Sequence, residues 1–143
     1  MLKPETNPRP TRVTLLAWLA FAIALWNGIR LVQAIIFRSV LKEYQAAPGP
    51  LYAAVSGGFW LLTGLAIAWG LWRGKSWAWF ATLGGAAGYG SWYWFDRLIL
   101  QKPHSNGPFA LVTTVVILFV ILLILFSPRA RKYFSNGKKK HEN

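Results

Sequence analysis

Residues 13–29 read VTLLAWLAFAIALWNGI and contain no Lys, Arg, Asp or Glu. Three more runs, 51–72, 77–95 and 109–126, share this absence of charge. A helix needs about 20 apolar residues to cross the roughly 30 Å hydrocarbon core of a bilayer. Backbone groups in lipid must be hydrogen-bonded within their own segment, so a run of this length forms a helix. The pattern predicts an all-α membrane protein with four transmembrane helices in one domain.

The composition agrees with a chain that lies mostly in lipid. Hydrophobic residues make up 55% and charged residues 14% of its 143 residues, whereas charged residues approach a quarter of a soluble domain. Cysteine is absent, so the sequence offers no disulfide and no thiol ligand for a metal. We expect spans at about 13–37, 51–72, 77–100 and 108–126.

The basic residues predict the orientation of the four spans. Eleven of the sixteen Lys and Arg flank the side that holds both termini and the 73–76 turn. Bases in short flanking segments are retained in the cytoplasm, so both termini are predicted to be inside. The order is then a cytoplasmic N-terminal segment (1–12), a transmembrane domain (13–126) and a basic cytoplasmic tail (127–143), in a multi-pass protein of the cell (inner or plasma) membrane.

The tail directly follows the fourth span, so its bases are expected to contact anionic lipid headgroups. They are Arg129, Arg131, Lys132, Lys138, Lys139 and Lys140. The net charge of +12 is largely explained by this arrangement, and we expect no nucleic-acid partner.

The first helix is predicted to extend beyond the outer interface to about Gln45. Arg30, Arg38 and Lys42 fall on a four-residue row, and Val32, Ile36 and Val40 fall on another. Such an extension has a basic stripe and an apolar stripe. It either lies against headgroups or docks a partner.

Small residues predict how the helices pack. The third span contains GGAAGYG at 84–90, and the second contains a milder small-residue pattern. Small residues allow close backbone approach in lipid, so we expect a central contact between these two spans, with the fourth facing lipid. The residues expected at this contact are Gly57, Gly58, Gly84, Gly85 and Gly88. A flat quinone or pigment in the glycine groove is the alternative; no cofactor is assigned, and bound lipid is expected.

The stretch GYGSWYWFDRLIL at 88–100 places a carboxylate, Asp96, at the end of an aromatic cluster. Counting about 1.5 Å per residue along each helix brings Asp96 and Arg30 to similar depth. We expect an Asp96–Arg30 ion pair with Asn27 and Gln33 nearby. The alternative is that these four residues and Arg97 line a polar pocket that opens outward, for binding or conduction.

The sequence contains no pair of titratable groups with distinct roles, as acid–base catalysis requires, so we do not expect an enzyme. The favoured interpretation is a non-catalytic accessory or scaffolding subunit of a larger membrane assembly, in contact with lipids and with other subunits or copies of itself. The alternative is a small oligomeric transporter or channel with the outward polar pocket at Asn27, Arg30 and Asp96.

Three segments together resemble uncharacterised small four-span integral membrane proteins of bacteria. They are WGLWRGKSWAW at 69–79, YWFDR at 93–97 and SPRARKYF at 127–134. The resemblance implies the same architecture, and it implies no activity.

Overall fold

The computed structural model describes residues 10–45, 48–100 and 106–139, with the side chains of the last helix described up to Ser135. The elements in order are α1 (Thr11–Ile36), α2 (Arg38–Glu43), α3 (Pro50–Arg73), α4 (Ser76–Phe95), the π-helical turn η1 (Asp96–Leu100), α5 (Gly107–Leu125) and α6 (Pro128–Lys139). These residues are helical and contain no strand, which confirms the all-α prediction. Helices α1, α3 and α5 are long and apolar enough to cross a membrane.

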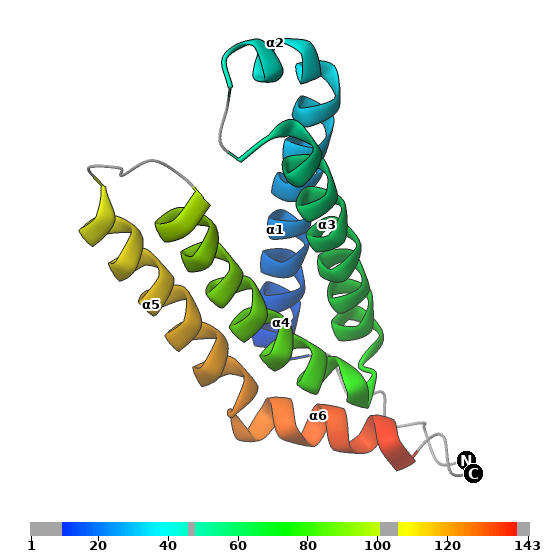
Figure 1. Cartoon of the computed structure of the whole chain (residues 1–143). Helices are drawn as coiled ribbons and strands as arrows, with labels where there is room; N and C mark the ends of the chain where they lie inside the picture. The colour runs from blue at the N-terminus through cyan, green and yellow to red at the C-terminus, as the bar shows by residue number, and fades with distance from the viewer. Residues whose placement is uncertain (1–9, 46–47, 101–105, 140–143) are drawn as a thin grey trace, which may run out of the picture.

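The four long helices form two antiparallel pairs, α1 with α3 and α4 with α5 (Figure 1). The pairs converge at the end of the molecule that carries the α3–α4 turn and α6, which we call the base. They separate toward the opposite end, the open end, which carries α2 and η1 (Figure 1). The molecule is therefore closed at one end and divided at the other.

The hydrophobic core lies at the base. It is built from the first turns of α1 and α4, the last turns of α3 and α5, and one face of α6. Its buried members are Val13, Leu16, Ala17, Ile67, Leu71, Ala78, Ile121, Leu125, Ala130 and Phe134. Trp79 of α4 adds a polar tie, because its indole N–H donates to the Leu125 carbonyl at 3.1 Å and satisfies a carbonyl at the end of α5.

The closest helix contact joins α1 to α3, where the sequence predicted a central contact between α3 and α4. A Cβ atom on Gly57 would lie 2.9 Å from the Asn27 carbonyl oxygen and 3.1 Å from the Leu31 amide nitrogen. A Cβ on Gly64 would lie 2.8 Å from the Ala24 Cβ. The small residues of α3 therefore receive the backbone of α1, as small residues do in lipid.

The other glycines expected at the packing centre have different surroundings. Gly85 faces Ile67 of α3 so closely that an added Cβ would lie 2.6 Å from its Cδ1, and Gly88 faces Trp60 at 3.5 Å. Gly58 has only a Leu31 methyl nearby at 3.9 Å, and Gly84 has no atom within 4 Å. The α3–α4 contact thus combines small residues with large rings, which keeps these two helix axes further apart than those of α1 and α3.

The turn between α3 and α4 requires glycine at position 74. Gly74 has φ of 64° and ψ of 31°, the left-handed conformation that ends many helices. The following amide, on Lys75, donates to the Gly70 carbonyl at 3.0 Å. The ring of Tyr133 from α6 packs on Gly74, where a Cβ would lie 2.7 Å from the Tyr133 hydroxyl oxygen.

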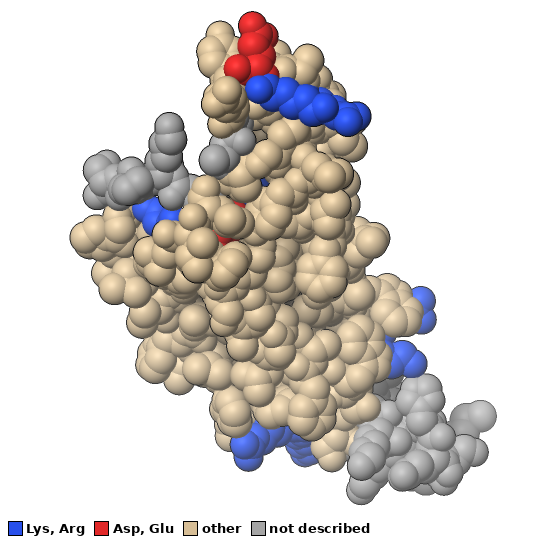
Figure 2. Space-filling model, in the orientation of Figure 1, with Lys and Arg blue, Asp and Glu red and all other residues tan. Residues whose placement is uncertain are grey.

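Residues 128–139, which the sequence assigned to a basic tail, form the helix α6 across the base (Figure 1). Ala130 and Phe134 are buried in the core, whereas Arg129, Arg131 and Lys132 are exposed. The side chains of Lys138 and Lys139, and all of Lys140, lie outside the described residues. In the view of Figure 2, basic side chains appear at the base and near α2, and a wide band almost without charge lies between them. That band is where hydrocarbon is expected.

The predicted extension of the first helix is interrupted. Helix α1 ends at Ile36, Phe37 has φ of −94° and ψ of 21°, and α2 resumes at Arg38 and ends at Glu43. A four-residue repeat continues through this region, but no glycine or proline marks the break. The periodicity therefore predicted the helical conformation and missed its interruption.

Two neighbouring glycines test the α1–α3 contact. Gly57→Ala presses a methyl group on the α1 backbone, and overpacking of this kind costs about 1–3 kcal/mol. Gly58→Ala meets only ordinary contacts and gains up to about 1 kcal/mol of helix propensity. We expect the thermal unfolding midpoint in one detergent to fall for Gly57→Ala and to hold or rise for Gly58→Ala. Equal midpoints for both variants would contradict the contact.

Candidate functional site

The five residues expected to form the polar cluster have different surroundings. Asn27 and Asp96 are buried, with 0% and 2% of their surfaces exposed. Arg30 and Arg97 are half-buried, and Gln33 is exposed. Asn27, Arg30 and Asp96 contact one group of aromatic side chains at the open end, which is described first, and Arg97 belongs to a separate cavity.

A tyrosine and a tryptophan connect the acid to the base. The Trp92 indole N–H donates to the Tyr52 hydroxyl oxygen at 2.9 Å, and that hydroxyl is hydrogen-bonded to the Asp96 carboxylate. The guanidinium carbon of Arg30 lies 5.3 Å from the centroid of the Trp92 ring, in cation–π geometry. Two aromatic side chains therefore connect Asp96 to Arg30. The direct ion pair expected from the sequence stays a prediction.

Asn27 joins the same group from the middle of α1. Its Nδ2 donates to the Ile23 carbonyl at 2.8 Å and to the Tyr89 hydroxyl at 3.4 Å. The Tyr89 ring packs edge-on against Trp60, with centroids 5.0 Å apart, and lies 5.5 Å from Trp92. We call Tyr52, Trp60, Tyr89 and Trp92 the aromatic bridge. It connects α1, α3 and α4.

The aromatic bridge accounts for burial of a carboxylate in this part of the chain. A buried polar group is costly unless it is hydrogen-bonded. The bridge supplies a partner to Asp96 through the Tyr52 hydroxyl of α3, and an acceptor to the Asn27 amide nitrogen through the Tyr89 hydroxyl of α4. Aromatic pairs in edge-on or tilted geometry add about 0.5–1.5 kcal/mol beyond the area they bury. The arrangement favours the structural interpretation of Asp96 and Asn27 over a pocket that opens outward.

A role for Tyr52 in the polar cluster was not predicted from the sequence, although the position of Tyr52 in the chain suggested one. It lies in the first turn of α3, and Trp92 and Asp96 lie at the end of α4. Antiparallel neighbours bring these two ends to the same depth. A polar aromatic residue at the start of one span is therefore a candidate partner for a carboxylate at the end of the next.

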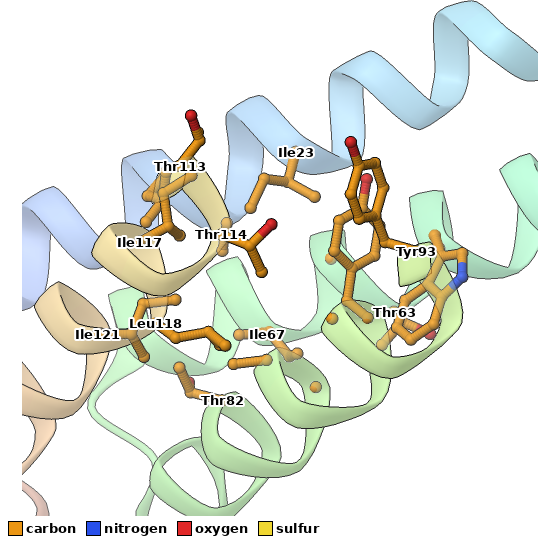
Figure 3. A pocket seen from close by; sticks show the side chains of 18 of the residues that line it. Ile23, Thr63, Ile67, Thr82, Tyr93, Thr113, Thr114, Ile117, Leu118 and Ile121 are labelled. Carbon is orange, nitrogen blue, oxygen red and sulfur yellow. The ribbon is translucent and has the colours of Figure 1, made fainter. Parts of the chain in front are cut away.

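A cavity of about 500 Å³ separates the two helix pairs. Its walls come from α1, α3, α4 and α5, with Arg97 of η1 and Asn106 at the open end. Figure 3 shows Ile67, Leu118 and Ile121 gathered toward one end and Tyr93 toward the other. Small residues of α4 make room opposite the large aliphatic side chains of α5. Gly85 and Gly90 are two of them.

The chemistry of the cavity is that of an apolar binding site. Four threonines line it: Thr63, Thr82, Thr113 and Thr114. The hydroxyls of three of them donate to carbonyls of their own helices: Thr82 to Ala78 at 2.6 Å, Thr113 to Phe109 at 2.9 Å and Thr114 to Ala110 at 2.8 Å. Of the five residues predicted to cluster, Arg97 alone lines this space. Within the described residues there is no group of three His, Cys, Asp or Glu side chains that could hold a metal ion.

Comparisons with known protein families, with curated proteins and with solved structures find no match to this chain. The resemblance of its three tryptophan-rich and basic segments to small bacterial membrane proteins therefore stays a prediction. The geometry of the aromatic bridge and of the cavity carries the functional argument.

Removal of one hydroxyl tests the aromatic bridge. Tyr52→Phe takes a hydrogen-bond partner from both Trp92 and Asp96, and a buried group left without its partner costs about 1–3 kcal/mol. We expect a clear fall in the thermal unfolding midpoint in detergent. Tyr44→Phe, at a side chain that is 79% exposed, is the matched control and should leave the midpoint unchanged. A shift of the same size in both variants would show that the bridge does not stabilise the fold.

Proposed function

We propose that this chain is a non-catalytic, four-span protein of the cell membrane that acts as an accessory or scaffolding subunit of a larger membrane assembly. The observation that carries the proposal is the incomplete packing of the α4–α5 side. Helix α5 buries only Ala110, Ile121 and Leu125, and a cavity remains between the helix pairs. A bundle with this gap is completed by other molecules.

The direction of the helices supports four crossings. Both α3 and α5 run from the open end to the base (Figure 1), and each has the length and composition of a membrane span. If both cross the membrane in the same direction, the chain must cross back between them. Helix α4 is the element available for this crossing, and its 20 residues extend about 30 Å at 1.5 Å per residue. Its glycines, tyrosine and tryptophans lower its apolar character without adding charge.

The distribution of charge supports a cytoplasmic location for the end of the molecule that we call the base. Six basic residues with described side chains flank this end: Arg12, Arg73, Lys75, Arg129, Arg131 and Lys132. Four belong to the open-end half: Arg30, Arg38, Lys42 and Arg97. The excess of basic residues at this end supports its cytoplasmic location, because positive flanks are retained in the cytoplasm.

Single cysteines test this topology, since the natural chain has none. Glu43→Cys, Arg73→Cys and Ser135→Cys each place a thiol at an exposed position. A membrane-impermeant maleimide should label position 43 in intact cells, and it should label positions 73 and 135 only after the membrane is opened. Labelling of 73 and 135 from opposite sides would contradict four spans with both ends inside.

The outer surface of α5 is the candidate contact for a partner subunit. Large side chains project around most of its circumference, and Phe119 is 59% and Leu123 is 57% exposed. Packing of apolar side chains between helices drives association in lipid. The aromatic bridge and the core hold α1, α3 and α4 to one another, so α5 keeps the largest surface for a neighbour.

Site-specific photo-crosslinking tests the accessory role. A photoreactive phenylalanine at Phe119 should give one discrete adduct with another membrane protein, in cells that naturally contain this chain. The same group at Phe59 of α3, which is 60% exposed, is the control and should give lipid adducts only. On a native gel in mild detergent the chain should comigrate with that partner. Migration as an isolated 16.1 kDa chain, with lipid adducts at both positions, would contradict the role.

The cavity itself favours a second candidate, a small carrier. It extends between the helix pairs, and among the described residues that line it Arg97 is the cation, toward the open end. Self-association on a native gel without any other subunit would favour this candidate. The apolar walls suit an amphiphilic solute better than an ion, because ions in membrane pathways need polar groups near the midplane.

A further inference from the structure

The cavity between the helix pairs differs in chemistry from end to end. Toward the base it is closed by Leu16, Ile67 and Ile121, which are buried aliphatic side chains. Toward the open end it is lined by Tyr93, Arg97 and Asn106. Between these ends, Thr82, Thr113 and Thr114 direct their hydroxyls to carbonyls of their own helices. A ligand that fits this space is apolar along its length and polar at one end.

The shape of the cavity suits one hydrocarbon chain. From Thr82 to Arg97 the wall formed by α4 and η1 rises about 22 Å at 1.5 Å per residue. The volume of about 500 Å³ also falls within the range of protein sites for small ligands.

Arg97 determines which charge the polar end of a bound ligand should carry. Among the described residues that line the cavity, Arg97 is the charged one. Its Nη1 donates to the Tyr93 hydroxyl at 3.4 Å, and its Nη2 is a buried donor without a hydrogen-bond partner among the described residues. A guanidinium pairs with phosphate through parallel hydrogen bonds. The π-helical turn that carries Arg97 is a rare conformation that occurs often at functional sites.

We propose that this cavity binds an anionic phospholipid, with one acyl chain between the helix pairs and the phosphate at Arg97 and Tyr93. The second chain stays in the surrounding bilayer. Binding supplies an acceptor to the buried Nη2 of Arg97 and apolar contacts to the walls. Both this site and the accessory role are argued from the gap between the helix pairs, but the lipid site is formed by this chain alone, so lipid retention by the purified chain tests it separately.

Native mass spectrometry of the purified chain tests the headgroup. The full chain in detergent is titrated with phosphatidylglycerol and, separately, with phosphatidylcholine of the same acyl chains. We expect one phosphatidylglycerol to be retained more tightly than phosphatidylcholine. Arg97→Gln should weaken its retention about ten- to a hundredfold, as expected for loss of charge-assisted hydrogen bonds. Arg38→Gln, an exposed base on α2, is the matched control and should leave the retention unchanged.

A second variant tests the acyl-chain position without altering charge. Gly90 lines the cavity, and a Cβ there would meet only a Leu118 methyl at 3.9 Å. Gly90→Leu should fill the space, reduce phosphatidylglycerol retention by tenfold or more, and preserve the thermal unfolding midpoint. Equal retention of the two lipids, equal losses in Arg97→Gln and Arg38→Gln, or full retention in folded Gly90→Leu would each overturn the proposal.

Discussion

The close backbone contact between α1 and α3 is the constraint on which the rest of the structure depends. Gly57 and Gly64 place α3 directly on the α1 backbone near Asn27 and Ala24. In lipid this contact cannot rely on the hydrophobic effect, so its fit determines the register of the pair. The register brings Tyr52 and Trp60 of α3, together with Asn27 and Arg30 of α1, to the same side of the pair. Helix α4 then packs against these aromatic rings and hydrogen-bonding groups of α1 and α3.

Two different kinds of interaction hold α4 in place, one at each end. At the base, α4 packs through Ala78 into the aliphatic core. At the open end, Trp92 and Asp96 bond to Tyr52, a short polar network in surroundings where each unmet hydrogen bond is costly. Among the described contacts, those that hold α5 lie at the base, in the aliphatic core and in the hydrogen bond from Trp79 to the Leu125 carbonyl. The cavity lies where the second kind stops, so its position follows from the unequal support of the two helices in that pair.

Much of the fold could be predicted from the sequence, because charge-free runs and the Gly-Pro pairs before α3 and α5 define the long helices. The pairing of the helices could not be predicted. The spacing of Gly57 and Gly64 shows that one face of α3 carries small residues, but it does not show which helix packs against that face. Residues 127–139 read as a tail because bases dominate them, although Ala130, Tyr133 and Phe134 follow helical spacing. The sequence singled out Asp96 and Arg97 as neighbouring charged residues at the end of an aromatic cluster. Their separate surroundings depend on side-chain directions that change within the π-helical turn.

Helix α6 gives the base of the molecule a surface with two faces. Its side chains Arg129, Arg131 and Lys132 are exposed, while Phe134 on its other face is held in the core. Tyr133 rests on Gly74, a residue whose left-handed backbone has no close substitute. If these basic side chains meet an anionic membrane surface, as the charge pattern predicts, a force on α6 reaches the turn between α3 and α4 through this contact.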